Sequence, residues 1–246
     1  MSDAPRPFGE SVGAQVEART QLEARLPQPP VGHYVATVGK HRIGLPLVQV
    51  RPDLAIALLE TTSVYLDFVV ACGADLADSL RRRNADVVVS AATLGIPVGA
   101  AVAKALGLHR QYVLMKTEKA HLADALVEPL TSTTTQGRQM LRLDRRWLPH
   151  LAGKRTVFVD DVISTGGSSA AGLRLLRAAG AHVVGLGAFL VEGDGWKGAL
   201  GAEDAELVHA LGRVPVFRPN GRGGWQEDWA CCCLLYTSDA ADDSLR

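Results

Sequence analysis

Cysteine is scarce in this chain of 246 residues, and three of its four cysteines stand side by side at positions 231 to 233. Adjacent cysteines lack the spacing of zinc ligands, and Cys72 alone remains elsewhere, which argues against a zinc site and against a disulfide framework. An excess of charge is also missing, because 26 Lys and Arg balance 26 Asp and Glu. The chain therefore lacks the basic surplus of a nucleic-acid-binding protein.

Long apolar runs are missing as well. No stretch approaches the roughly 20 residues needed to cross a bilayer, and the opening MSDAPRPFGES has no apolar signal core. We therefore expect a cytoplasmic protein with no membrane partner. Aromatic residues make up only 5% of the chain, whereas hydrophobic residues reach 47% and glycines number 25. This composition suits one large α/β domain, in which Ala- and Leu-rich helices cover a sheet.

The most informative stretch is TVFVDDVISTGGSSAAG, residues 156 to 172. Its apolar, β-branched start predicts a buried parallel strand that ends at Asp160 and Asp161. A loop of small hydroxyl-bearing residues and glycines follows, and then a helix that runs to Gly180.

This order of residue types suits a phosphorylated sugar. Glycines and a helix start bring backbone amides around one point, where they bind a phosphate. Two carboxylates at the carboxyl edge of a parallel sheet accept hydrogen bonds from ribose hydroxyls or hold a hydrated Mg²⁺. Plain turn chemistry is the alternative for the glycines. It does not account for the two acids, because a buried carboxylate without partners is costly.

VFVDDVISTGGS resembles the 5-phosphoribosyl-1-pyrophosphate signature of type I phosphoribosyltransferases. The resemblance implies a doubly wound parallel sheet with helices on both faces, a lid hairpin, a small N-terminal hood and a homodimer. It also implies that Asp160 and Asp161 hold the ribose and, directly or through water, Mg²⁺. The resemblance assigns binding of the 5-phosphate to the loop residues Ser164, Thr165, Gly166, Gly167 and Ser168. It also implies that Val162 contacts the substrate.

Three segments divide the chain. We expect residues 1–30 to form an N-terminal helical arm, because apolar residues recur at helical spacing before Pro27. Residues 31–230 form the predicted phosphoribosyltransferase domain, in which the strand-like text of residues 31–60 supplies the hood. Residues 231–246 resemble translated sequencing-adapter read-through and are predicted to be a non-native tail.

Within the domain we expect a helix over residues 65–83, parallel strands over 86–90, 111–115 and 182–191, and a helix over 97–106. Strands over 125–130 and 138–143 flank a polar tip and predict the lid hairpin. A further helix and a last strand, residues 214–217, are expected within 203–218.

The resemblance also assigns residues on three further loops. Ala92, Thr93, Leu94 and Gly95 stand where type I enzymes hold the pyrophosphate with backbone amides, often beside a non-proline cis bond. Lys116, and after it Lys119, stand where the family places cations for the pyrophosphate. After the strand over 182–191, the base-contact candidates are Leu190, Glu192 and Trp196.

The implied reaction transfers a 5-phosphoribosyl group from 5-phosphoribosyl-1-pyrophosphate to a nucleobase, with release of pyrophosphate in nucleotide salvage. Its catalytic residues would be Asp160, Asp161 and Lys116. Leu94 replaces the arginine common in adenine-specific relatives, and Ser164 replaces the aspartate common in 6-oxopurine relatives. Adenine-type, xanthine-type and other acceptors therefore stay open, with an adenine-type purine preferred.

Two other readings also stay open. One is a regulator that binds phosphoribosyl pyrophosphate without catalysis. The other is a different α/β enzyme acting on a phosphorylated sugar, such as a pyrophosphate-using kinase or a phosphatase.

Overall fold

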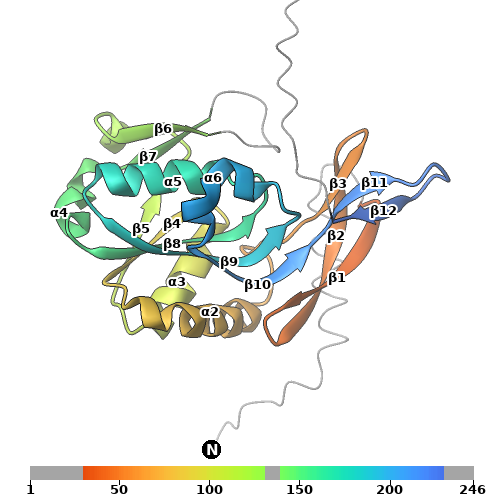
Figure 1. The fold of residues 1–246 in the computed structure, drawn as a ribbon, viewed down its shortest axis with the longest axis horizontal. Coiled ribbons are helices and arrows are strands. Elements are labelled where there is room, and N and C mark those ends of the chain that lie inside the picture. Colours follow the sequence, from red (N-terminus) through yellow and green to blue (C-terminus); the bar gives the residue numbers. More distant parts are fainter. Residues whose placement is uncertain (1–29, 131–138, 230–246) are drawn as a thin grey trace, which may run out of the picture.

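A computed structural model describes residues 30–130 and 139–229 of the chain. The predicted helical arm, except for residue 30, the tip of the predicted lid and the predicted non-native tail lie outside these described residues. Two five-stranded sheets and one separate two-stranded hairpin make up the β structure of the described part. Figure 1 shows the two larger sheets beside each other, joined near β10.

The larger layer is a parallel sheet in the order β10-β9-β8-β4-β5. Its strands are β4 (Val87–Ala91), β5 (Gln111–Leu114), β8 (Arg155–Ile163), β9 (His182–Glu192) and β10 (Val208–Val214). Apolar β-branched runs predict buried parallel strands, and β4, β8 and β9 are indeed internal. The predicted parallel strands over 86–90, 111–115, 156–159 and 182–191 are thereby confirmed.

Helices cover both faces of this sheet (Figure 1). On one face lie α2 (Leu66–Leu80) and α3 (Gly95–Ala105), and on the other lie α5 (Gly167–Ala178) and α6 (Trp196–Ala205). The buried residues separate accordingly into two large apolar clusters, one on each face. The doubly wound α/β fold expected from the sequence is confirmed.

A second sheet, which we call the hood sheet, has the order β1-β2-β3-β11-β12. It contains β1 (Gly32–Val38), β2 (His41–Arg51), β3 (Leu54–Ala57), β11 (Val216–Pro219) and β12 (Trp225–Asp228), all paired antiparallel. Its inward residues, among them Leu45 and Phe217, join the same apolar cluster as α2 and α3. The amide of Gly39 donates to the carbonyl of Leu211 on β10, which ties the two sheets together.

Short elements complete the chain. Three-residue 3-10 helices span Arg81–Arg83, Ala120–Leu122 and Arg145–Trp147, and α4 spans Leu148–Leu151. The predicted hairpin is present as β6 (Leu126–Leu130) and β7 (Gln139–Leu143), which pair antiparallel. It packs on α5, over the face of the sheet opposite α2.

The structure corrects three expectations. The strand that carries the acids does not end at them, because β8 pairs with β9 as far as Ile163. The segment 203–218 is mostly strand, since α6 ends at Ala205 and β10 begins at Val208. The strand expected at residues 214–217 is not the last one, because β12 follows it, returns along β11 and completes the hood sheet.

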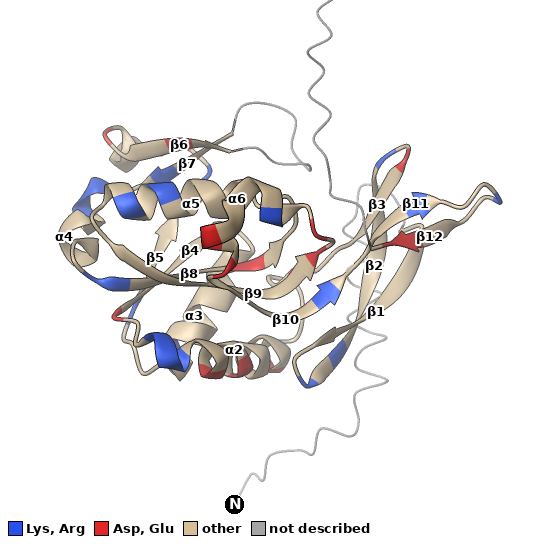
Figure 2. Ribbon diagram, in the orientation of Figure 1, with Lys and Arg blue, Asp and Glu red and all other residues tan. Residues whose placement is uncertain are grey.

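Acidic and basic residues are interspersed over the helices and both sheets (Figure 2). Among the described residues, no helix is both long and apolar enough to cross a membrane.

Candidate active site

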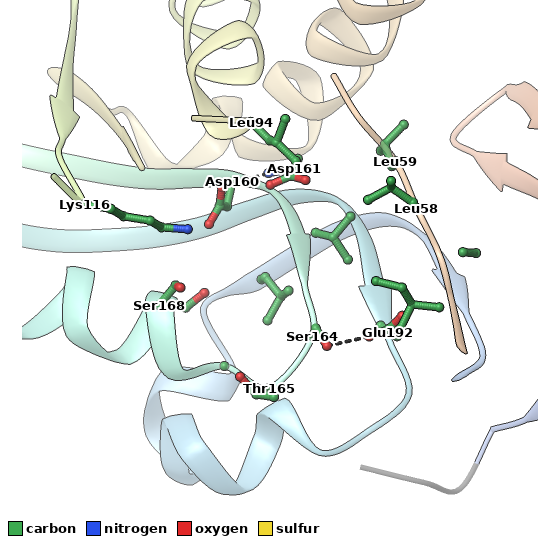
Figure 3. Close-up of a pocket in the computed structure, with 16 residues that line it drawn as sticks. Leu58, Leu59, Leu94, Lys116, Asp160, Asp161, Ser164, Thr165, Ser168 and Glu192 are labelled. Atoms are coloured by element: carbon green, nitrogen blue, oxygen red, sulfur yellow. Dashed lines mark hydrogen bonds between the residues drawn. The ribbon is translucent and has the colours of Figure 1, made fainter. Parts of the chain in front are cut away.

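A cavity of about 270 Å³ lies at the carboxyl ends of β8 and β9, under the hood sheet (Figure 3). Open α/β sheets bind ligands at this edge, because loops and helix starts converge there. The parallel sheet and its loops contribute Leu94, Lys116, Asp160, Asp161, Val162, Ile163, Ser164, Thr165, Gly166, Ser168, Ser169 and Glu192. The hood side contributes Ile56, Ala57, Leu58 and Leu59.

The two acids lie side by side at the centre of the cavity. Asp160 is 7% exposed, and its Oδ1 accepts a hydrogen bond of 3.1 Å from the backbone amide of Asp161. Burial raises the pKa of Asp160, although Asp161 and the positive charge of Lys116 oppose the rise. Burial and then the neighbouring charge of Asp160 raise the pKa of Asp161 well above its ordinary value. The raised pKa values mean that the ionised carboxylates are costly in this environment. A cation or hydroxyl donors beside them would stabilise the ionised form.

This pair fits Mg²⁺, a hard cation that takes oxygen ligands and usually keeps several waters. Within the described residues no group of three or more His, Cys, Asp and Glu is set to hold a metal. Two carboxylates together with waters and substrate oxygens are the set that Mg²⁺ commonly uses. Asp160 and Asp161 are therefore the residues that would hold it.

A glycine is required beside Asp160. A Cβ atom placed on Gly95 would lie 2.6 Å from Oδ1 of Asp160, so a larger residue would displace the carboxylate. Gly95 begins α3, and the peptide bond between Ala92 and Thr93 just before it is cis, where the resemblance placed such a bond. Thr61, from the segment that follows the hood strand β3, donates a hydrogen bond to the carbonyl of Leu94. The loop before α3 is thus fixed against both Asp160 and the hood side.

The loop between β8 and α5 forms the floor of the cavity. Gly166 precedes α5 with φ +79°, and a Cβ there would lie 2.7 Å from the carbonyl oxygen of Trp196. Glycine is required on both counts. Because the first amides of α5 have no partner within the helix and lie at the positive end of its dipole, this end suits a phosphate.

Ser164 and Glu192 meet at the hood side of the cavity. The Ser164 hydroxyl donates to Oε2 of Glu192 at 2.5 Å, and Glu192 is 5% exposed. One residue follows β8 and the other ends β9, so adjacent parallel strands bring them together. The sequence marked both as candidates, but it gave no sign that they contact each other.

Ten of the predicted site residues line the cavity: Leu94, Lys116, Asp160, Asp161, Val162, Ser164, Thr165, Gly166, Ser168 and Glu192. Gly167 starts α5 just behind the floor, and Ala92, Thr93 and Gly95 flank Leu94 without lining the cavity. Lys119 is exposed and lies outside the lining.

Two base-contact candidates are placed elsewhere. Leu190 is fully buried in the apolar cluster under α2, and Trp196 is buried in the cluster around α5. The Trp196 indole N–H donates to the carbonyl of Gly193, which satisfies its polar atom inside the fold. Both residues serve packing, and neither lines the cavity.

Sequence reasoning did not name individual lining residues from the hood. Ile56, Ala57, Leu58 and Leu59 lie in and directly after β3, within the segment LAIALLE. The only signal was that this segment is apolar where the resemblance expects a hood. Ser169, in the first turn of α5, was also missed.

Comparison with known proteins finds orotate and adenine phosphoribosyltransferases among the relatives. Over 110 residues the chain is 34% identical to the orotate phosphoribosyltransferase of Staphylococcus haemolyticus, a match that covers 45% of each chain. Over 132 residues it is 31% identical to the adenine phosphoribosyltransferase of Novosphingobium aromaticivorans, covering 54% of this chain and 71% of the relative. The match thus spans about half the length of the orotate relative.

Among solved structures, the adenine phosphoribosyltransferase of Thermoanaerobacter pseudethanolicus is similar, with a TM-score of 0.55 and 22% identity. The match covers 69% of this chain and 95% of that one, and it shows a shared fold. A model of the phosphoribosyl transferase domain matches residues 67–200, which contain the acids, the loop before α5 and Lys116. The chain therefore belongs to the phosphoribosyl transferase domain family.

Proposed function

We propose that this protein transfers the 5-phosphoribosyl group of 5-phosphoribosyl-1-pyrophosphate to a purine base, with release of pyrophosphate. One observation carries the proposal: the acid pair, the amide-rich start of α5 and Lys116 line one cavity. A phosphorylated, activated sugar needs these three partners, for its hydroxyls, its 5-phosphate and its leaving group.

The residues have separate roles in this proposal. Asp160 and Asp161 accept hydrogen bonds from the ribose hydroxyls and hold Mg²⁺, which when bound offsets the negative charge of the pyrophosphate oxygens. The first amides of α5, with Thr165 and Ser168, hold the 5-phosphate. Lys116, from the loop after β5, reaches toward Asp160 and carries positive charge to the leaving pyrophosphate (Figure 3).

The reaction breaks the bond between C1 of the ribose and the pyrophosphate oxygen and forms a bond from C1 to a ring nitrogen of the base. Positive charge develops on the sugar ring as the leaving group departs. The acid pair lies beneath the position of the ribose and stabilises that charge. Because the phosphate and hydroxyl contacts fix the sugar, orientation supplies part of the acceleration.

The acceptor base is not decided by similarity. Relatives named for orotate and for adenine are 34% and 31% identical to this chain, a difference too small to rank them. Ser164 supports a purine of the adenine type, because a serine cannot act as a proton acceptor comparable to aspartate at neutral pH. A homodimer and a cytoplasmic location stay predictions.

The test is a pyrophosphate-release assay on the full chain with 5-phosphoribosyl-1-pyrophosphate, Mg²⁺ and a panel of bases. Adenine, guanine, hypoxanthine, xanthine and orotate are supplied one at a time, and the nucleotide product is identified by mass. We expect base-dependent release with a purine. Tight binding of 5-phosphoribosyl-1-pyrophosphate without release for any base would instead indicate the non-catalytic sensor.

A further inference from the structure

A second cavity, of about 560 Å³, lies at the opposite edge of the parallel sheet from the candidate active site. Its lining comes from the end of α3 and the segment that leads into β5, which begins at Gln111. The other end of α3 begins at Gly95, beside Asp160, so an 11-residue helix roughly 16 Å long separates the two cavities. The two linings share no described residue. A cavity of this size is within the range of small-molecule sites.

Basic side chains dominate the polar part of this second lining. It contains Lys104, His109 and Arg110, and no acidic residue belongs to it in the described chain. All three side chains are exposed, and none has an ion pair with an acidic side chain of the described residues. Arginines elsewhere are commonly paired, as Arg174 is with Glu128 at 2.8 Å. The cavity therefore carries positive charge that no neighbour balances, and it favours an anion.

Helix capping does not account for these cations. The last carbonyls of α3 are already bonded, because the Gly107 amide donates to Lys104 at 3.1 Å and the Leu108 amide donates to Ala103 at 2.9 Å. Gly107 has φ +77°, which this kind of helix end requires. A cation in the last turn also complements the helix dipole. That explains Lys104 but not the two basic residues that follow the helix.

One residue of the lining, Gln111, is anchored on two sides. Its Nε2 donates to the carbonyl of Ile96 at 3.0 Å, and its Oε1 accepts from the Ser90 hydroxyl at 3.0 Å. A Cβ atom on Gly99 would lie 1.9 Å from this Oε1, so a glycine there lets α3 approach the side chain. Arg110 directly precedes Gln111, and its backbone is thereby fixed relative to α3.

The chemistry of the lining suits a phosphate group joined to an organic part. Lysine and arginine bind phosphate oxygens through charge-assisted hydrogen bonds, and a histidine ring N–H adds a donor. Beside the cations lie the apolar side chains of Ala100, Ala103 and Leu108, which inorganic phosphate alone would leave uncovered. We propose that this second cavity binds a phosphate monoester, with its phosphate on the three cations and its organic part on the apolar side chains. This site is separate from the proposed transfer reaction and goes beyond it.

NMR of the histidine ring signals tests binding in the full chain. The chain has seven histidines, and His109→Asn identifies the signal of His109 by its loss. AMP is the probe for a phosphate monoester, and inorganic phosphate is the probe for the free ion. No histidine belongs to the described lining of the first cavity, so AMP bound there should leave the His109 signal in place. We expect both probes to shift this signal saturably, with half-saturation at about tenfold lower concentration for AMP.

A double variant, Lys104→Ala with Arg110→Ala, removes two charges from the cavity. We expect the affinity for AMP, read from the His109 signal, to fall about tenfold or more. Lys40→Ala with Arg42→Ala is the matched control, because it removes the same two charges at the start of β2, away from both linings. It should keep the wild-type affinity. All four replaced side chains are exposed, so thermal melts should show both variants folded.

Three results would overturn the inference. The first is a His109 signal that neither probe shifts saturably. The second is an equal affinity for AMP in the two double variants. The third is binding of inorganic phosphate at least as tight as that of AMP, which would assign the cavity to the free ion. Absence of pyrophosphate release with every base would count against the proposed function alone, because none of these measurements involves transfer.

Discussion

The carboxyl edge of the parallel sheet and the hood sheet meet at one cavity but contribute different chemistry. The parallel sheet supplies every charged residue of the described lining, including Asp160, Asp161 and Lys116. The hood side supplies only apolar side chains, residues 56–59. The difference teaches that the two layers have separable tasks in the proposed reaction: the first would hold the phosphorylated sugar, and the second would enclose the base.

The largest expected effect comes from the sheet edge. Asp161→Asn keeps the shape of the side chain but removes a carboxylate from the centre of the cavity, so we expect kcat/KM to fall about 10²- to 10³-fold. The loss should be similar for every base that is accepted, because the ribose is common to all reactions. Steady-state kinetics with two bases check this result.

Asp67→Asn is the matched control, since Asp67 is exposed on α2 and lies outside the cavity lining. It should retain full activity. Near-normal kcat/KM in Asp161→Asn would show that the reaction does not need this carboxylate. The proposed division of tasks between the two sheets would then be wrong.

A smaller effect is expected from the hood. Leu58 is half-buried and lines the cavity, so Leu58→Ala removes apolar contact from the base at little cost to folding. We expect the KM for the base to rise about 3- to 10-fold, with the KM for 5-phosphoribosyl-1-pyrophosphate unchanged. Leu66→Ala, a change at a leucine that is 73% exposed on α2, is the control. If both KM values rise together after Leu58→Ala, the hood also contributes to holding the sugar.

The smallest effect concerns stability and its dependence on pH. The pKa of Asp161 is raised in the folded protein by burial and by Asp160, from an ordinary value of 3.8. A carboxyl whose folded pKa is raised favours folding below its unfolded pKa, and this contribution is lost as pH rises through the folded pKa. Deprotonation of the pair as the pH rises therefore destabilises the fold.

Asp161→Asn should accordingly raise Tm at pH 7 by roughly a few degrees in the absence of metal and substrate, even though it lowers kcat/KM. The gain should shrink as the pH is lowered toward about 4, where the wild-type carboxyl is also protonated. Thermal melts of both proteins from pH 4 to pH 8 measure the difference. A Tm difference that is constant with pH would show that deprotonation of Asp161 does not lower the stability of the fold.

Much of the site was predictable because its signals are local. Asp160, Asp161 and the loop to Ser168 follow one another in the chain, and a strand, a loop and a helix start place them at one edge whatever the rest of the fold does. The helix expected before the strand at 214–217 was wrong, since Val208–Val214 pairs with β9 as a strand. Its sequence, VHALGRV, mixes apolar and polar residues in a weak pattern, so partner strands decide its structure.

The hood was harder to predict than the parallel sheet. Its strands β11 and β12 come from the far end of the chain, and Phe217 pairs with Ala55 of β3. No local pattern encodes such a pairing, because both segments also satisfy the rules for isolated turns and short strands. The apolar cluster that Phe217 shares with Leu45 and α2 decides it.

By itself the sequence determined the parallel strands, the acid pair, the glycine-containing loop before α5 and the family resemblance, because each depends on neighbouring residues that share one backbone path. Tertiary structure alone decided that Ser164 donates to Glu192, that Leu58 closes the cavity and that the C-terminal hairpin completes the hood. The physical reason is that these contacts join segments far apart in the chain. Burial of a common apolar core, rather than any local preference, brings such segments together.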